Sequence, residues 1–136
     1  MAVLPDLKNG TNATRVLLRI EAVIAAFVGL VAYAHYGIGW QFFFLTILIP
    51  DLGMLGYLKG PRIGAACYNF THFVGWAYLC IGAGLIFELP KVLAIGLVWL
   101  VHVGIDRALG YGLKYPEGFK MTHLSFIRRP SDPVGF

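Results

Sequence analysis

The sequence predicts an all-α integral membrane protein in which four transmembrane helices form a bundle. Of its 136 residues, 58% are hydrophobic and only 13% are charged, whereas soluble proteins average about 45–50% apolar and about 25% charged residues. A soluble core cannot accommodate that much apolar surface. The 17 glycines agree with this class, because glycine is more frequent in transmembrane helices than in soluble ones. A chain of this length forms a single domain.

Four apolar stretches are each long enough to cross about 30 Å of hydrocarbon. These predicted spans occupy residues 15–36, 38–58, 63–87 and 92–109, and a tail of water-exposed composition follows at 110–136. The second span contains Pro50, which lacks a backbone N–H and therefore predicts a kink beside polar partners or a cavity. The third span follows the tight, basic turn Lys59-Gly60-Pro61-Arg62.

The distribution of basic residues predicts that both termini are cytoplasmic. Four spans place the two termini on the same side of the membrane, and cytoplasmic segments carry an excess of Lys and Arg. Lys91 alone falls on the opposite side. The basic residues on the predicted cytoplasmic side are Lys8, Arg15, Arg19, Lys59, Arg62, Arg107, Lys114, Lys120, Arg128 and Arg129. This asymmetry accounts for the net charge of +4 without a nucleic acid partner; the expected partners are membrane lipids.

Polar residues within the predicted spans fall at one depth. With 1.5 Å of rise per residue, they lie about 5–14 Å inside the cytoplasmic interface. The residues of this layer are Glu21, Asp51, Asn69, His72, His102 and Asp106. Ionisable residues within spans are costly, usually face the bundle interior and are candidates for function. The sequence therefore predicts a polar site in the cytoplasmic half, with all four spans contributing.

Helical spacing groups these residues on shared faces. His102 and Asp106 are four residues apart, so their side chains lie one turn apart on the same face. In the third span, Tyr68 and Asn69 share a face with His72 by the same rule. These spacings bring the two histidines toward one another from different spans.

Two histidines and two aspartates predict a site for a divalent metal ion. Asp51, His72, His102 and Asp106 are the expected ligands, and imidazole with carboxylate suits Zn, Mn or Fe. A bound ion lowers the pKa of a coordinated water, which predicts hydrolysis of a lipid or lipid-phosphate. In that scheme Glu21 is the general base.

The catalytic scheme also draws on basic and aromatic residues near the end of the fourth span. Arg107 or Lys114 would stabilise a phosphate group. The glycine-flanked segment at 110–115 would fold beneath the bundle, so that Tyr111, Lys114 and His123 reach the polar layer. Its alternative is a linker whose aromatic side chains lie at the lipid headgroups.

Other functions stay open from the residues alone. The polar layer can instead supply interhelical hydrogen bonds, which average about 0.6 kcal/mol in membrane bundles. The chain would then be a non-enzymatic subunit or scaffold that packs on a partner membrane protein or a second copy. Haem ligation by the two histidines is disfavoured, because the carboxylates would be costly beside an apolar macrocycle. Ion passage is disfavoured as well, because the outward halves of the spans are apolar.

The polar motifs carry a resemblance to a known family. They are the run from Pro50 to Tyr57, the run from Gly60 to Ala65, Tyr68-Asn69 with His72, His102, the Asp106–Tyr115 run with Gly-Tyr-Gly-Leu-Lys-Tyr at 110–115, and Gly118 to Leu124. From its first span to Leu124 the chain resembles a small bacterial membrane family known as domain of unknown function 4260. The resemblance implies a four-helix protein of the bacterial inner membrane and supplies no activity.

A second similarity concerns chemistry. The Pro-Asp, His and His-x-x-x-Asp elements are similar to those of membrane-bound metal-dependent hydrolases related to zinc phospholipases, which implies a hydrolase. Gly53 stands where those enzymes have a second aspartate, and Thr122-His123 is the nearest approach to their His-x-x-Thr-His-Ser box.

Overall fold

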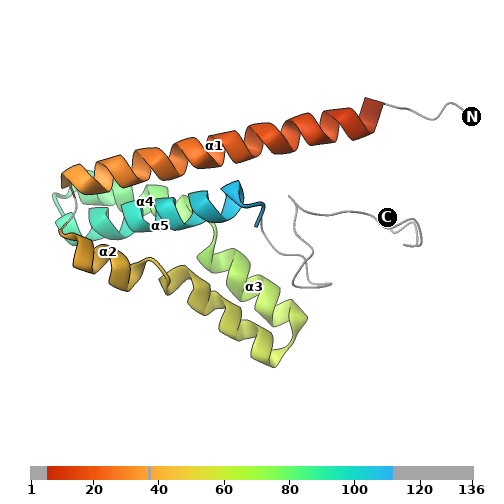
Figure 1. Ribbon diagram of the computed structural model, residues 1–136. Helices are drawn as coiled ribbons and strands as arrows, with labels where there is room; N and C mark the ends of the chain where they lie inside the picture. The colour runs from red at the N-terminus through yellow and green to blue at the C-terminus, as the bar shows by residue number, and fades with distance from the viewer. Residues whose placement is uncertain (1–5, 37, 112–136) are drawn as a thin grey trace, which may run out of the picture.

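The computed structural model describes residues 6–36 and 38–111, with side chains from residue 12 onward, and this part of the chain is entirely helical (Figure 1). The all-α class is confirmed. The elements are α1 (Asp6–Tyr36), α2 (Trp40–Thr46), a 3₁₀-helix η1 (Ile49–Lys59), α3 (Pro61–Thr71), α4 (Val74–Ile86) and α5 (Pro90–Ala108). Two of the four predicted spans are thus each divided into two helical pieces.

Helix α5 is the central element, with α1 and α4 packed along it (Figure 1). Its sequence is apolar on several sides, which is typical of a helix surrounded by other helices. Leu97, Val98 and Val101 of α5 form the buried core with Tyr33 of α1 and Phe43 of α2. The Tyr33 hydroxyl donates to the Gly39 carbonyl at 2.6 Å and so holds the turn between α1 and α2.

Glycines of α5 allow its two neighbours to approach closely. A Cβ atom at Gly104 would lie 2.9 Å from the Ala26 Cβ and 3.0 Å from the Ala22 carbonyl oxygen of α1. A Cβ atom at Gly96 would lie 2.9 Å from the Ala77 carbonyl oxygen of α4. Small residues at helix crossings are the usual device of membrane helix packing, and here they fix α5 against both neighbours.

The helices η1 and α3 form a tight antiparallel pair that extends away from the layer of α1, α4 and α5 (Figure 1). Gly60, with φ of 130°, makes the turn, and Pro61 begins α3, the helical position where a missing N–H costs nothing. A Cβ atom at Gly53 would lie 2.8 Å from the Cys67 carbonyl oxygen. The absence of a side chain at Gly53 therefore lets η1 approach the backbone of α3 at Cys67 and the side chain of Thr71.

The predicted kink at Pro50 is present as a break in the helix. Helix α2 ends at Thr46, and η1 begins at Ile49 with Pro50 in its first turn. This change of path aims Asp51, the next residue, at α5.

The second break, at His72 and Phe73, was not predicted, and residues 63–87 are not one continuous helix. Helix α3 ends at Thr71 and α4 begins at Val74. The break leaves carbonyl groups without helical partners, and two indoles satisfy them: Trp76 donates to Phe70 at 2.8 Å and Trp99 to Thr71 at 2.7 Å. The cause is tertiary, because Trp99 lies on α5.

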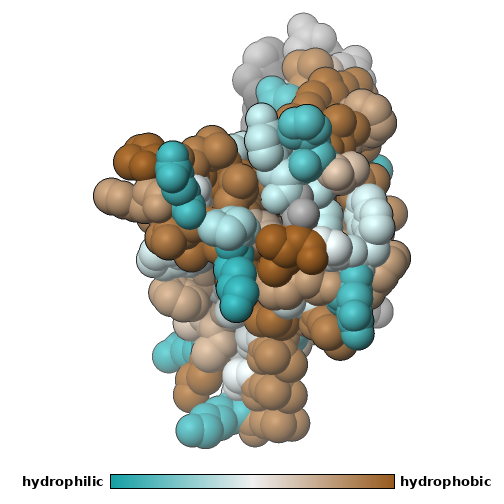
Figure 2. All heavy atoms as spheres, turned by 90° about the vertical axis from the view of Figure 1, so that its left-hand side faces the viewer, coloured by the Kyte–Doolittle hydropathy of each residue, from teal (hydrophilic) through white to brown (hydrophobic). Residues whose placement is uncertain are grey.

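The length and composition of the helices suit a membrane protein. Three helical segments are long and apolar enough to cross a bilayer: Asn12–Tyr36, Trp40–Lys59 and Pro61–Ile86. Hydrophobic side chains, brown in Figure 2, cover much of the visible face, and Phe27, Leu45 and Leu58 are 67%, 73% and 86% exposed. The central helix α5, which contains all but the last residue of the fourth predicted span, is not among these three segments. The cytoplasmic location of both termini stays a prediction.

Candidate metal centre

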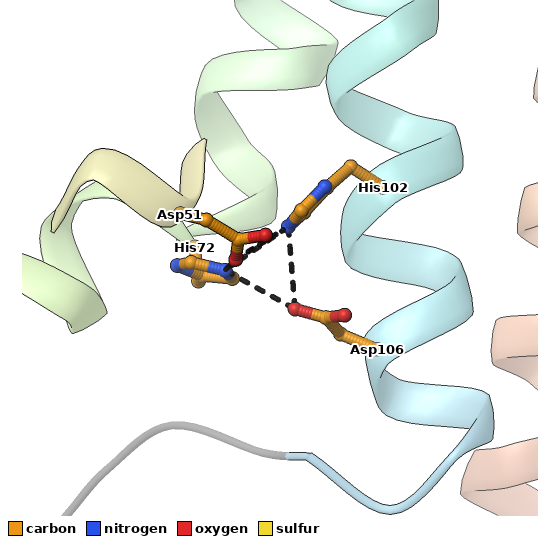
Figure 3. A group of neighbouring side chains, drawn as sticks. All are labelled: Asp51, His72, His102 and Asp106. Atoms are coloured by element: carbon orange, nitrogen blue, oxygen red, sulfur yellow. Dashed lines mark hydrogen bonds and ion pairs between the residues drawn. The ribbon is translucent and has the colours of Figure 1, made fainter. Parts of the chain in front are cut away.

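Four polar side chains converge between η1, α3 and α5 (Figure 3). Asp51 comes from the first turn of η1, His72 from the end of α3, and His102 and Asp106 from adjacent turns of α5. One ligand atom from each residue lies within 4.8 Å of all the others. The two histidines are 3% and 5% exposed, whereas the side chains of Asp51 and Asp106 retain 39% and 21% exposure. The group is buried on its imidazole side and open on its carboxylate side.

The two imidazoles present Nε2 to the same point. The Nε2 atoms of His72 and His102 are 3.2 Å apart. The Asp51 Oδ1 atom lies 3.4 Å from the His72 Nε2 and 3.2 Å from the His102 Nε2. The Asp106 Oδ2 atom lies 3.1 Å and 3.3 Å from the same two nitrogens. Two nitrogens and two oxygens therefore face one another at close quarters.

The far nitrogen of His102 is held by a carbonyl that Pro50 leaves free. The Ile47 carbonyl would bond residue 50 in a 3₁₀ turn or residue 51 in an α-helix. Residue 50 is proline, which has no N–H, and the Asp51 N–H donates to Leu48 instead at 3.1 Å. The Nδ1–H of His102 donates to the Ile47 carbonyl. This bond fixes the tautomer of His102 and leaves the lone pair of Nε2 toward the centre.

His72 is held in the same way within α3. Its Nδ1 lies 3.0 Å from the Tyr68 carbonyl and 3.0 Å from the Thr71 Oγ1. The Thr71 hydroxyl donates to Tyr68 at 3.0 Å, so we assign the proton to Nδ1 of His72. The Tyr68 ring stacks on the imidazole with centroids 3.8 Å apart, and Tyr68 also interacts with the Asp106 carboxylate.

The hydrogen bonds leave four acceptors converging on one point. With both Nδ1 atoms donating to carbonyls, both Nε2 atoms carry lone pairs toward two carboxylate oxygens. A positive charge at this point, either a metal ion or an additional proton on an imidazole, would stabilise the arrangement. Metal-ligating histidines usually donate their other N–H to a carbonyl or carboxylate, and both histidines here do so. The Asp/His/His/Asp group could therefore hold a metal ion.

The structure does not bring the predicted catalytic residues Glu21 and Arg107 to this centre. They line a separate pocket of about 150 Å³ between α1, α4 and α5. The reason is helical rotation: Arg107 directly follows Asp106 and therefore projects from a different face of α5.

The remaining predicted residues are placed as follows. Tyr68 stacks on His72 at the centre, and Asn69 is partly buried on α3. Tyr111 follows α5 and is 51% exposed, and its backbone N–H donates to the Asp106 carbonyl at 2.8 Å. Lys114 and His123 lie outside the described residues.

Sequence reasoning missed the carbonyl groups that orient the imidazoles. For His102 a sequence indication exists, because Pro50 stands three residues after Ile47 and leaves that carbonyl free. For His72 the Thr71-His72 pair gives no comparable indication, since it depends on where α3 ends.

Comparisons with known proteins identify a family and supply no activity. No curated protein and no solved structure matches the chain. A family model described as a domain of unknown function, DUF4260, matches residues 15–127. This range contains all four residues of the candidate metal centre. The protein therefore belongs to the DUF4260 family.

Proposed function

We propose that the protein binds one divalent metal ion through Asp51, His72, His102 and Asp106. The observation that carries this proposal is the convergence of four acceptor atoms within 4.8 Å while both imidazole Nδ1 atoms donate to backbone carbonyls. A divalent ion balances the two carboxylates and leaves the imidazoles neutral. Two imidazolium rings would instead place like charges against one another, with Nε2 atoms 3.2 Å apart.

The function we propose for this ion is hydrolysis of a lipid or lipid-phosphate. Four protein ligands complete a tetrahedral zinc site, but they leave two positions free around an octahedral ion such as Mn²⁺ or Fe²⁺. The exposure of Asp51 gives an open side at which water and an ester could bind. A bound divalent ion supplies Lewis acidity and a water of lowered pKa. The apolar helices around the centre favour a membrane lipid as substrate.

We further propose that the centre lies in the cytoplasmic half of the inner membrane of a bacterium. The asymmetric distribution of Lys and Arg supports this orientation. Arg107, at the end of α5, would then mark the cytoplasmic interface close to Asp106.

Metal analysis of the purified protein tests the proposed ligands. The wild type should contain about one Zn, Mn or Fe per chain, and the double variant His102→Ala with Asp106→Ala should contain almost none. His35→Ala is the matched control, because His35 is exposed at the end of α1 and far along the chain from the centre. Equal, near-zero metal in wild type and double variant would refute the metal site.

Hydrolysis is tested separately with phosphatidic acid and phosphatidylglycerol in detergent micelles. Product formation should require added Mn²⁺, Fe²⁺ or Zn²⁺ and should be lost in the double variant. If the wild type binds metal stoichiometrically but turns over neither lipid, the metal site stands and the proposed reaction on these phospholipids is wrong.

A second candidate function is structural. The same four residues connect η1 and α3 to α5, and the Trp99–Thr71 hydrogen bond also joins α3 to α5. In a non-enzymatic subunit this polar group would serve only to hold the helices together. Copurification of a stoichiometric membrane partner, with metal content and partner binding unaffected by His102→Ala, would favour this function.

A further inference from the structure

The pocket between α1, α4 and α5 contains two opposite charges that the metal centre does not use. It measures about 150 Å³ and is lined by Glu21 of α1, Tyr78 of α4 and Arg107 of α5, with apolar residues such as Leu18 and Val103. Both residues line this pocket, yet within residues 12–36 and 38–111 no ion pair joins Glu21 to Arg107.

Two opposite charges that line one pocket without pairing with each other are available to a ligand. Glu21 lies inside the apolar segment Asn12–Tyr36, where ionisable side chains normally pair or mark a binding site. Arg107 is partly buried one residue before the end of α5. Both groups line the same space, so a molecule that fills it meets a carboxylate and a guanidinium together.

The two charges define the ligand. A simple anion would be attracted by Arg107 and repelled by Glu21. A simple cation would be attracted by Glu21 and repelled by Arg107. A zwitterion satisfies both. Glu21 and Tyr78 are exposed toward the surroundings of the helices, and in a membrane those surroundings are lipid. The volume suits a small headgroup, while acyl chains can lie along the exposed apolar face of α1, where Leu17 is 61% exposed.

We propose that this pocket binds the phosphoethanolamine headgroup of phosphatidylethanolamine. The guanidinium of Arg107 binds the phosphate in the manner typical of arginine, and the carboxylate of Glu21 accepts hydrogen bonds from the primary ammonium. Choline headgroups carry the same charges but have no N–H to donate. The site should therefore distinguish the two zwitterionic lipids. It uses none of the four metal ligands and does not depend on the proposed function.

Lipid-dependent melting of delipidated protein tests this site. Palmitoyl-oleoyl phosphatidylethanolamine, phosphatidylcholine and phosphatidylglycerol are titrated in detergent micelles, and apparent affinities are taken from the shift in melting temperature. Phosphatidylethanolamine should bind the wild type about tenfold more tightly than phosphatidylcholine, the difference expected from charge-assisted hydrogen bonds. Equal affinities in the wild type would overturn the proposal, and this comparison needs no variant.

Two variants assign the roles. Glu21→Gln should remove the preference for ethanolamine over choline headgroups. Arg107→Gln should lower the apparent affinity for all three lipids by about tenfold. Glu88→Gln and Arg62→Gln are matched controls, because both side chains are exposed outside the pocket, Glu88 in the turn after α4 and Arg62 in the first turn of α3. A preference that survives Glu21→Gln would refute the assignment.

Two further outcomes would also overturn the proposal. If Glu21 and Arg107 simply pair with each other, each single variant lowers the lipid-free melting temperature and lipid preference is unaltered. If soluble O-phosphoethanolamine stabilises the protein as well as the lipid does, the pocket binds a soluble zwitterion. Metal content should be the same in both variants as in the wild type.

Discussion

Replacing Pro50 by alanine should weaken metal binding although residue 50 is not a ligand. The change supplies an N–H that can bond the Ile47 carbonyl, three residues earlier, in the geometry of a 3₁₀ turn. That N–H competes with the Nδ1–H of His102, which now holds this carbonyl. Loss of such an outer partner typically lowers metal affinity about 10- to 100-fold, which corresponds to about 1.4–2.7 kcal/mol.

The assay is competition for Mn²⁺ or Zn²⁺ between the detergent-solubilised protein and a chromophoric chelator. Pro61→Ala is the matched control, because Pro61 is exposed at the first position of α3, where a missing N–H is tolerated. Pro50 is fully buried, so the melting temperature of the metal-free protein is measured as well. This second measurement separates a general loss of stability from a loss of affinity.

Unchanged metal affinity in Pro50→Ala would refute the reasoning. The Ile47 carbonyl would then not control the tautomer of His102, and the break before Pro50 would serve only to turn the chain. Equal losses of affinity in Pro50→Ala and Pro61→Ala would refute it too, since only one of these prolines leaves a carbonyl free for His102.

Three further results are expected. Gly104→Val should destabilise the protein by about 1–3 kcal/mol, because the new Cβ would lie 2.9 Å from the Ala26 Cβ; thermal unfolding measures this, and Gly82→Val, which meets nothing within 4 Å, should change little. Trp99→Phe should cost about 1–3 kcal/mol by leaving the Thr71 carbonyl unsatisfied, and an unfolding temperature equal to that of the wild type would contradict this. Removing metal with a chelator should lower the melting temperature of the wild type by the linkage between binding and folding, but not that of the His102→Ala, Asp106→Ala variant.

The helical fold follows from features that sequence carries directly. Long apolar stretches define where helices can form, and Pro50 marks one break because proline lacks an N–H. The break at His72 could not be predicted, since no glycine or proline stands at residues 72 and 73. It depends on hydrogen bonds from Trp76 and Trp99, and the contact with Trp99 exists only once α5 packs against the end of α3.

The candidate site was predictable in part for a related reason. Spacing on one helix predicted that His102 and Asp106 share a face, and depth predicted that Asp51 and His72 lie at the same level. The depth of a residue in the membrane follows from its position along the helix, but it does not show in which direction around the helix axis the side chain points. Glu21 therefore matched the others in depth and still faces a different pocket. Rotation is set by packing, here by the close approach of α1 to Gly104.

The two helix breaks have a mechanical consequence. The pair η1 and α3 is attached to the remaining helices through Ile47–Leu48 at one end and His72–Phe73 at the other. Both links are short and non-helical, so we expect η1 and α3 to move together relative to the other helices. Asp51 and His72 belong to this pair, whereas His102 and Asp106 belong to α5. An ion bound by all four residues would hold the η1–α3 pair against α5 and restrict its movement. We therefore expect amide exchange in η1 and α3 to slow when metal is bound.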